Sequence, residues 1–403
     1  MNAELPLNCA MEFRNVDILF PNPGREARKS MREALAALDG GATRADIQNR
    51  YGVVVGVADA KLSVARGEIS VLMGLSGSGK STLLRAANGL NPVTRGAVLV
   101  RDGDCAIDVA DCGRLQMRRL RRERVAMVFQ QFGLLPWRTV RENVGFGLEL
   151  RGEGAAQRKL IVDEKLELVG LTQWSERYVR ELSGGMQQRV GLARAFATDA
   201  DILLMDEPFS ALDPLIRAKL QDELLQLQAR VKKTILFVSH DLDEALKLGD
   251  RISILQHGRI IQTGTAEDIV LAPADEYVAE FVQHMNPLTV LTGSMIMQRR
   301  EQLTGEGAIV WLDPAGRYQL SLNAANEVLG LTLDGKTHAL RHVREEVDCG
   351  LTSPGLALAP ASLSLKSIIQ LRHLSGHPVL VVEEGKLLGV CGENEIIRAL
   401  AGR

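Results

Sequence analysis

The stretch GLSGSGKST, at residues 74–82, decides the fold of this chain. It fits the pattern G-x-x-x-x-G-K-[ST], with Gly74, Gly79, Lys80 and Ser81 at the fixed positions. Small residues allow consecutive backbone N–H groups to turn toward one point, where an anion of phosphate size fits. The apolar stretch EISVLM before it is typical of a strand, and STLLRAANGL after it is typical of a helix. Because such a loop requires this context, we predict a phosphate-binding loop in preference to a plain Gly/Ser-rich turn.

The residues of this loop have expected roles in holding a nucleotide. The dipole of the following helix favours negative charge at its N-terminus. We expect Lys80 to reach the β- and γ-phosphates of ATP, and the hydroxyl of Ser81 to ligate Mg²⁺. The other expected nucleotide contacts in the loop are Gly74, Ser76, Gly77, Ser78, Gly79 and Thr82.

The composition is that of an ordinary globular protein. The chain has 403 residues, of which 46% are hydrophobic and 24% charged, and this length suits two or three domains. The formal net charge of −2 gives no basic excess for binding nucleic acid. We expect neither a membrane span nor a secretion signal, because no run of 18 apolar residues and no apolar N-terminal segment is present. The five scattered cysteines predict free thiols in a reducing compartment rather than a zinc site; they are Cys9, Cys105, Cys112, Cys349 and Cys391.

Strand and helix patterns alternate along the first two thirds of the chain. Strands are predicted at VAMVF (125–129), DILLM (201–205) and KTILFVS (233–239), with helical patterns between them. This alternation predicts an α/β fold whose parallel sheet is covered by helices and binds ligands at the carboxyl ends of its strands. Before the phosphate loop, the strand MEFRNVDILF is followed by a helical insert at about residues 25–50. The stretch LQMRRLRRER (115–124) predicts a basic helix. The simplest interpretation of its arginines is a solvent-exposed helix face, and the alternative is a contact with an anion or a membrane.

Two acids follow the apolar strand in ILLMDEP, residues 202–208. Asp206 can hold the Mg²⁺ that accompanies the nucleotide. Glu207 can orient a water for attack on the γ-phosphate and accept its proton. Adjacent acids also occur as simple helix caps, but the phosphate loop upstream favours the catalytic interpretation.

A second phosphate-sized anion site is predicted in ELSGGMQQR, residues 181–189. Ser183, Gly184 and Gly185 offer a hydroxyl and unobstructed N–H groups before a helix, this time without a lysine. With this motif the chain resembles the ATP-binding subunits of ABC transporters, whose signature is LSGGQ and whose counterpart here is LSGGMQ at 182–187. The resemblance implies a homodimer in which the signature of one subunit, including Gln187, closes on the nucleotide held by the other.

The resemblance covers residues 11 to about 285 and implies further roles. It implies a P-loop core with a mostly parallel sheet, antiparallel N-terminal strands and an α-helical subdomain at about 132–190. Gln130, rather than its neighbour Gln131, matches the glutamine that senses Mg²⁺ and the attacking water. His240 in VSHD matches the histidine at the γ-phosphate, and Asp213 in SALD matches the loop that contacts the partner subunit. Phe20 is the first candidate for stacking on adenine, with Tyr51 as its rival.

Finer similarity points to the ATPases of quaternary-amine importers. The helical insert and stretches such as FQQFGLLPWRTVRENVGFGLELRG and SHDLDEALKLGDRI carry this similarity, and it favours choline, with glycine betaine and proline betaine as alternatives. It implies membrane-spanning permease subunits and an extracytoplasmic binding protein as partners, no nucleic acid, and a peripheral position on the cytoplasmic face of the inner membrane. A soluble ABC ATPase acting on nucleic acid or ribosomes is a remote alternative. A small-molecule phosphotransferase is disfavoured, because it would leave LSGGMQ without a role.

The composition changes near Asn286 and Pro287, so we predict an ATP-binding domain at 1–285 and a small α/β domain at 286–403. Residues 363–402 predict a helix, two strands joined by a Glu-Gly turn, and a second helix. This domain resembles tandem cystathionine-β-synthase (CBS) modules, well over about 363–402 and weakly over about 288–350. Such modules often bind adenosine nucleotides with a Ser/Thr three residues before an Asp, where this chain has Gly392 and Glu395. This departure leaves three alternatives for the C-terminal domain: it mediates dimerisation, it responds to ionic strength, or it is an inert remnant.

Overall fold

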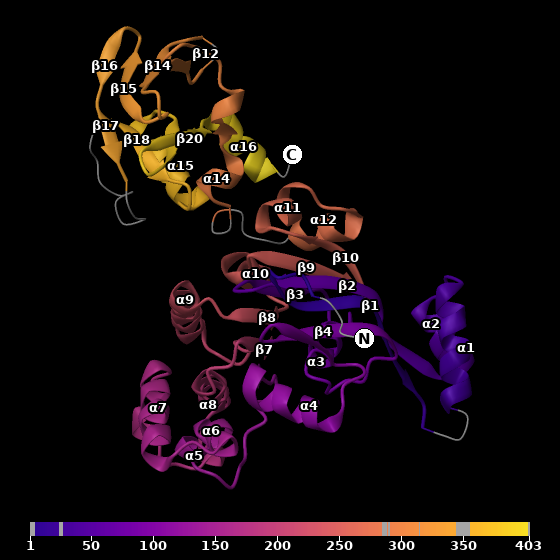
Figure 1. Cartoon of the computed structure of the whole chain (residues 1–403). Coiled ribbons are helices and arrows are strands. Elements are labelled where there is room, and N and C mark those ends of the chain that lie inside the picture. The colour runs from indigo at the N-terminus through magenta and orange to yellow at the C-terminus, as the bar shows by residue number, and fades with distance from the viewer. Residues whose placement is uncertain are drawn as a thin grey trace. The chain divides into compact units, whose positions relative to one another are not determined.

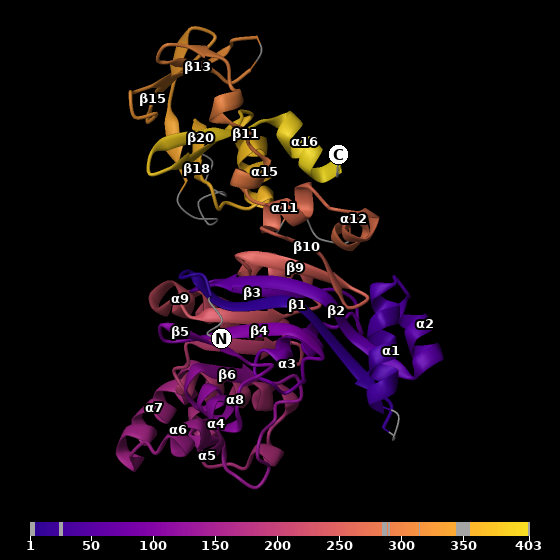
Figure 2. The ribbon, with the colours of Figure 1, turned by 45° about the vertical axis from the view of Figure 1, so that its right-hand side comes forward.

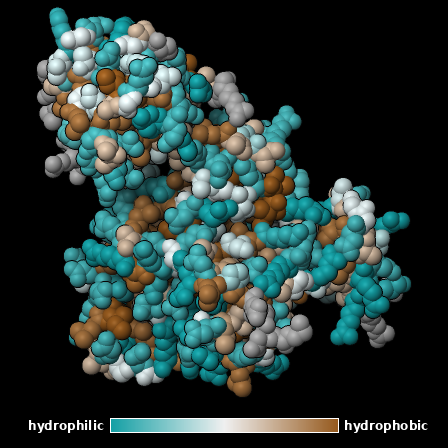
Figure 3. Space-filling model, turned by 45° about the horizontal axis from the view of Figure 1, so that its top comes forward, coloured by the Kyte–Doolittle hydropathy of each residue, from teal (hydrophilic) through white to brown (hydrophobic). Residues whose placement is uncertain are grey.

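The computed structural model describes residues 5–23, 27–283, 288, 291–313, 315–343 and 355–401. It divides the chain into two compact units, Met1–Ala279 and Glu280–Arg403. Asn286 and Pro287, where we predict the second domain to begin, lie outside the described residues, as does Cys349. None of the helices that these ranges contain combines the length and the apolar surface that crossing a membrane would need. On the face seen in Figure 3, hydrophilic residues dominate and hydrophobic ones form separate patches.

A six-stranded sheet forms the centre of the first unit. Its order is β10-β9-β3-β8-β7-β6, and all neighbours are parallel except β9 and β10. The strands are β3 (Ile69–Met73), β6 (Val125–Val128), β7 (Ile202–Asp206), β8 (Thr234–Val238), β9 (Arg251–Gln256) and β10 (Arg259–Gly264). Every residue of β3, β7 and β8 is buried, which explains their nearly continuous apolar sequence, because both faces of the sheet are covered. The predicted parallel sheet is confirmed.

A second, antiparallel sheet packs against the first. It has the order β2-β1-β4-β5, with β1 (Cys9–Pro21), β2 (Val53–Ala65), β4 (Arg95–Asp102) and β5 (Cys105–Asp108). One continuous hydrophobic core joins residues of both sheets, including Phe13 and Val98 on one side and Leu72 and Leu204 on the other, with Leu83 of the helix α3 (Lys80–Ala86). The antiparallel N-terminal strands are therefore confirmed, and this core fixes the start of α3 relative to both sheets.

Two helices, α1 (Ala27–Asp39) and α2 (Arg44–Tyr51), interrupt the chain between β1 and β2. They lie beyond the ends of these two strands (Figure 2). α2 begins with a capping box in which Thr43 and Asp46 satisfy each other's backbone N–H groups. These two helices occupy the segment, about 25–50, for which we predict a helical insert.

Helices of the segment 140–197 gather at one side of the parallel sheet (Figure 1). They are α5 (Val140–Val144), α6 (Phe146–Arg151), α7 (Ala155–Leu168) and α8 (Gly184–Ala197). The basic stretch before them forms α4 (Arg114–Arg119) and the π-helical turn η1 (Leu120–Arg124). The α-helices that follow β7, β8 and β10 in this unit are α9 (Pro214–Val231), α10 (Leu242–Leu248), α11 (Ala266–Leu271) and the start of α12 (Glu276–Gln283).

The second unit contains a mixed sheet in the order β11-β20-β19-β18-β17. Its strands are β11 (Gln298–Arg299), β17 (Leu340–His342), β18 (Leu356–Pro360), β19 (Val379–Glu383) and β20 (Lys386–Cys391), with the helices α14 (Gly293–Ile296), α15 (Leu365–Ser375) and α16 (Glu393–Ala401). The order α15, β19, β20, α16 confirms the predicted helix, strand, strand and helix. Glu384 and Gly385 join β19 to β20 with φ values of 50° and 84°, as a two-residue hairpin turn requires.

The first half of this unit is built differently from the second. An antiparallel meander runs through β12 (Gly305–Glu306), β13 (Ile309–Trp311), β14 (Tyr318–Leu322), β15 (Val328–Leu333) and β16 (Lys336–His338). Asp334 and Gly335, with φ values of 49° and 79°, form a tight turn between β15 and β16. The two sheets share one core, which includes Val310, Leu331 and Leu380.

Candidate functional site

The loop between β3 and α3 approaches two neighbouring strands so closely that its glycines are required. A Cβ atom on Gly74 would lie 2.1 Å from the carbonyl oxygen of Leu255, and one on Gly79 would lie 2.4 Å from that of Gly56. Their φ values of 141° and 105° are also ones that other residues rarely adopt. Ser76 and Gly77 are exposed, whereas Ser78 is buried and its hydroxyl has no hydrogen-bond partner in the described residues.

Lys80 is folded across this loop. Its Nζ donates hydrogen bonds to the carbonyls of Gly74, at 2.8 Å, and Leu75, at 3.0 Å. Burial lowers the pKa of Lys80, and the charges of Glu207 and Asp206 oppose this shift. An ammonium group has three donors, so one remains for a further acceptor. The hydroxyl of Ser81, the next residue, donates to Asp206 at 2.6 Å, so the phosphate loop and the end of β7 meet at one site.

Asp206 ends β7 and is fully buried. Its Oδ1 accepts a hydrogen bond from the Ser81 hydroxyl at 2.6 Å, and its Oδ2 accepts two from Arg85, at 2.8 and 3.1 Å. Arg85 therefore compensates a charge that would be costly to bury alone. Ser81 and Asp206 together present hydroxyl and carboxylate oxygens, which is the donor chemistry that Mg²⁺ prefers. The residues present fit this ion.

Three predicted residues meet at the carboxyl ends of β6, β7 and β8. Glu207 follows β7 and has an unusual φ of 49°. Its Oε2 accepts a hydrogen bond from Gln130 Nε2 at 3.1 Å and lies 3.3 Å from His240 Nδ1. The backbone N–H of Glu207 donates to the carbonyl of Val238 at 3.1 Å. The structure therefore brings a carboxylate, an amide and an imidazole together beside the phosphate loop.

The residues of the LSGGMQ motif lie at the start of α8. Ser183 is exposed and caps this helix by accepting a hydrogen bond from the backbone N–H of Met186. Gly184 is exposed and Gly185 partly buried, while the Gln187 side chain donates to the Leu182 carbonyl at 3.0 Å. Asp213 is also exposed and caps α9, where it accepts from the backbone N–H of Ile216. Ser183, Gly184 and Asp213 thus face solvent in a single chain.

Sequence reasoning missed two residues of this site. Gln188 is buried; its Nε2 donates to the Glu207 carbonyl at 3.0 Å and its Oε1 accepts from the Ala211 N–H at 3.0 Å. It thus ties α8 to the turn that carries Glu207. Arg85, described above, is the second. Its position four residues after Ser81 on the same helix was an available signal, whereas nothing local distinguishes Gln188 from Gln187.

The two aromatic candidates occupy different environments. The ring of Phe20 lies over Gly56, where an added Cβ would be 2.8 Å from Phe20 Cε2 and 3.0 Å from the methyl group of Thr82. Phe20 is 36% exposed, so one side of its ring is accessible beside the phosphate loop. Tyr51 instead packs on the hydrophobic cluster between α1, α2 and the strand ends, and Arg50 lies over its ring at 6.0 Å.

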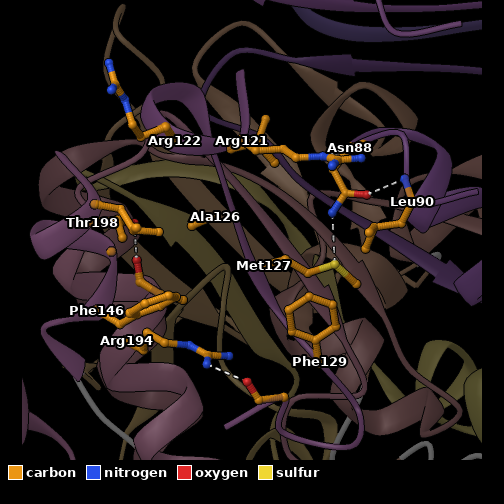
Figure 4. Close-up of a pocket in the computed structure, with 15 residues that line it drawn as sticks. Asn88, Leu90, Arg121, Arg122, Ala126, Met127, Phe129, Phe146, Arg194 and Thr198 are labelled. Carbon is orange, nitrogen blue, oxygen red and sulfur yellow. Dashed lines mark hydrogen bonds between the residues drawn. The ribbon is translucent and has the colours of Figure 1, made fainter. Parts of the chain in front are cut away.

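A cavity of about 330 Å³ is lined by residues that precede and follow Gln130 in the sequence, together with residues of other elements (Figure 4). Phe129 and Gly133, on either side of Gln130, form part of its wall, and Phe146 and Arg194 from α6 and α8 form another part. Arg194 donates hydrogen bonds to the carbonyls of Gly133 and Phe132, at 2.7 and 3.0 Å. The cavity thus opens between the end of β6 and the helices of the segment 140–197.

The described residues contain no group of three or more His, Cys, Asp or Glu side chains arranged to hold a metal ion. The cysteines that the structure describes, Cys9, Cys105, Cys112 and Cys391, are free. Burial raises the pKa of Cys391 to about 12, which makes it unreactive.

Comparison with known proteins gives a consistent result. Residues 57–210 match the ABC transporter family. The chain is 40% identical to the glycine betaine/proline betaine transport system ATP-binding protein ProV of Escherichia coli (strain K12), over 97% of each chain. It is 42% identical to the choline transport ATP-binding protein OpuBA of Bacillus subtilis (strain 168), over 56% of this chain and 58% of that one.

The structure resembles the ABC transporter cassette MJ0796, which has been solved as a dimer and, in a dimeric post-hydrolysis state, with bound ADP and Pi. The TM-score is 0.53, with 29% identity over 63% of this chain and 98% of the cassette. Proteins of this family bind ATP. With a phosphate loop, an LSGGMQ motif and an acidic strand end in one unit, the chain belongs to the ABC transporter family, as an ATP-binding subunit with ATPase activity.

Proposed function

We propose that this chain binds ATP with Mg²⁺ between two copies of itself and uses ATP hydrolysis to drive the import of a quaternary amine. The observation that carries the proposal is the meeting of Gln130, Glu207 and His240 beside the phosphate loop, at hydrogen-bond distances of 3.1 and 3.3 Å from the Glu207 carboxylate. The relatives named above support the transport role, because both are ATP-binding proteins of transport systems.

The phosphate loop would hold the triphosphate. The N–H groups of the loop and the remaining donor of Lys80 would bind the β- and γ-phosphates, with Gly74, Ser76, Gly77, Ser78, Gly79 and Thr82 completing the cradle. Ser81 and Asp206 would hold Mg²⁺, which supplies charge neutralisation when it is bound. Phe20 would stack on adenine, since its ring is accessible beside Thr82 whereas that of Tyr51 is engaged elsewhere.

Hydrolysis would use the group at the end of β7. Glu207 would accept a proton from the attacking water as the water oxygen bonds to the γ-phosphorus and the bond to the β–γ bridging oxygen breaks. Gln130 already donates to the Glu207 carboxylate at 3.1 Å, so it can fix the orientation of that group. His240 is exposed, and its imidazole can turn toward the γ-phosphate.

The second half of each site would come from the other copy. Ser183, Gly184, Gly185 and Gln187 lie at the start of a 14-residue helix, whose N-terminal N–H groups suit a phosphate. In a single chain Ser183 and Gly184 face solvent, as a group that closes on a partner's nucleotide must. Asp213 is exposed and is proposed to contact the partner subunit. The dimeric state of the cassette MJ0796 supports this arrangement.

Membrane-spanning permease subunits would contact the region after Gln130. The cavity beside Phe129 and Gly133 offers a concave surface, and Trp137 in FGLLPWRTV is 69% exposed. Both features suit an interface with another protein chain. The protein would therefore act as a peripheral subunit at the cytoplasmic face of the inner membrane. An extracytoplasmic binding protein would deliver the solute to the permease, and the permease would transmit its arrival to this subunit.

Choline is the first candidate solute, with glycine betaine and proline betaine as alternatives. All three carry a quaternary nitrogen. The test is the ATPase activity of the transporter assembled in lipid vesicles, with each solute loaded in turn on its binding protein. We expect choline to stimulate the ATPase activity most. Stimulation by a betaine alone would exclude choline, and basal activity that responds to none of the three would exclude the quaternary-amine class.

A further inference from the structure

The helices α1 and α2 are fixed firmly to the rest of the first unit. Ala34, Leu38 and Ile47 from the helices pack in one buried cluster with Leu19 and Val55 from the strands. Arg95 adds a polar link, because it donates to Asp17 at 2.6 Å and to both oxygens of Asp39, the last residue of α1, at 2.7 and 2.8 Å. The side chains on α2 are therefore held in place relative to the sheets.

Arg44, the first residue of α2, reaches the phosphate loop. Its Nη1 donates a hydrogen bond to the carbonyl of Gly77 at 3.2 Å, across 33 positions of sequence. The capping box at Thr43 fixes the backbone at this point. It also engages the nearby carboxylate of Asp46, which accepts from the Thr43 hydroxyl at 2.6 Å and from the Thr43 N–H at 3.2 Å. The Asp46 carboxylate thus accepts its hydrogen bonds within the capping box.

The guanidinium of Arg44 has no acidic partner in the described part of the chain. Burial lowers its pKa, and no carboxylate acts against that shift. A guanidinium group has five N–H donors, and the contact with Gly77 uses one. A half-buried cation with unused donors next to an exposed phosphate loop is suited to an anionic ligand that enters the loop.

We propose that Arg44 is a nucleotide-binding residue, which the helical insert places at the phosphate loop to contact the phosphate chain of ATP. This inference rests on the proposed ATP site and adds a second cation to it besides Lys80. It also gives the helical insert a role: the insert delivers a charge to the nucleotide that the core of the cassette does not supply.

The test is ATP binding by the full chain, measured by titration calorimetry at several salt concentrations. We expect Arg44→Ala to weaken ATP binding about three- to tenfold, and Arg44→Lys to keep most of the affinity. Salt should weaken ATP binding less in Arg44→Ala than in the unaltered chain, because one charge fewer contacts the ligand. Arg50→Ala, on the same helix but beside Tyr51, serves as the matched control and should bind ATP normally.

Three outcomes would overturn the proposal. The first is Arg44→Ala with unchanged affinity and unchanged salt dependence. The second is an equal loss in Arg44→Ala and Arg44→Lys together with a lower melting temperature, which would make Arg44 only an anchor of the loop. The third is normal ATP binding with loss of ATP-driven dimerisation, which would assign Arg44 to the contact with the second copy.

Lys80→Ala separates this inference from the proposed function. If the unaltered chain binds ATP and Lys80→Ala does not, a normal Arg44→Ala refutes the role of Arg44 alone. If Lys80→Ala binds ATP as the unaltered chain does, the proposed ATP site itself is wrong.

Discussion

Gln188→Met tests whether α8, the helix of the LSGGMQ motif, positions Glu207, the proposed general base. Methionine has a similar volume but lacks both polar groups, so the buried side chain loses its hydrogen bonds to the Glu207 carbonyl and the Ala211 N–H, each at 3.0 Å. At about 1 kcal/mol for each bond, the free energy of unfolding should fall by about 2 kcal/mol. For a unit of this size this corresponds to a decrease in melting temperature of about 4–8 °C.

The same substitution should reduce ATP turnover. Glu207 has a φ of 49°, a conformation that costs a non-glycine residue about 1–2 kcal/mol and that its surroundings must hold. Gln188 holds it through the carbonyl and Val238 through the N–H. With one of these lost, the carboxylate is less often in place, and we expect turnover to fall about tenfold, since about 1.4 kcal/mol corresponds to a factor of ten.

Two measurements are needed, chemical unfolding and steady-state ATP turnover. The matched control is Gln262→Met, because Gln262 also links backbone groups through its amide, to Asp268, Ala272 and Ala274, but lies on the strand β10 at the far edge of the sheet. The control should lose stability and keep its turnover. Gln188→Met with reduced stability and unchanged turnover would refute the positioning role.

The remaining predictions concern residues that we propose to act on the nucleotide. Glu207→Gln should keep ATP binding but lose turnover by about 10²- to 10⁴-fold, as expected for a general base, and unaltered turnover would remove it from that role. Lys80→Ala should weaken ATP binding about 10- to 100-fold in a titration, because charge-assisted hydrogen bonds to the phosphates are lost; normal affinity would contradict this. Ser183→Arg should prevent ATP-driven dimerisation, measured by sedimentation, and leave binding by the single chain intact; if that binding is lost as well, the shared site is wrong.

Sequence patterns were sufficient to predict the architecture of the first unit. Its central strands are short apolar runs that end in polar residues, and a strand such as Ile202–Asp206 can be recognised because it is buried on both faces. The phosphate loop and the acids of β7 could be assigned to one site because parallel strands present their carboxyl ends at the same edge. The roles of individual residues in binding and hydrolysis stay predictions.

The sequence did not reveal the contacts that depend on the order of strands in the sheet. Arg85 and Asp206 are 121 positions apart, and they meet because β3 and β7 flank β8. Gln188 and Glu207 meet only once α8 has packed against β6, the neighbour of β7 in the sheet. Arg44 reaches Gly77 only through the packing of the insert. Such contacts depend on tertiary packing, for which local periodicity carries no signal.

In the second unit the sequence predicted the elements correctly where helices and strands alternate. It did not predict the elements where short strands follow one another. Residues 365–401 have helical spacing and a clear turn, and they fold as predicted. The meander at 305–338 contains strands of two to six residues, too short for a recognisable alternation. Glu395 accepts a hydrogen bond from the Gly392 N–H at 2.9 Å and so caps α16. This engagement disfavours a nucleotide contact by Glu395, at the position where such modules carry their Asp.

The helical insert joins the cassette at the end of a closed hairpin. β1 and β2 remain paired up to Pro21 and Val53, so the strand register is complete before the insert begins. The main core between the two sheets contains none of the residues that the structure describes in the segment 22–52. A change in the length or sequence of the insert therefore leaves this main core intact, whereas its deletion would expose Leu19 and Val55 on the strands. Because the end of this hairpin lies beside the phosphate loop, it is a position where a cassette can acquire new control over its nucleotide while its ancestral fold stays unchanged.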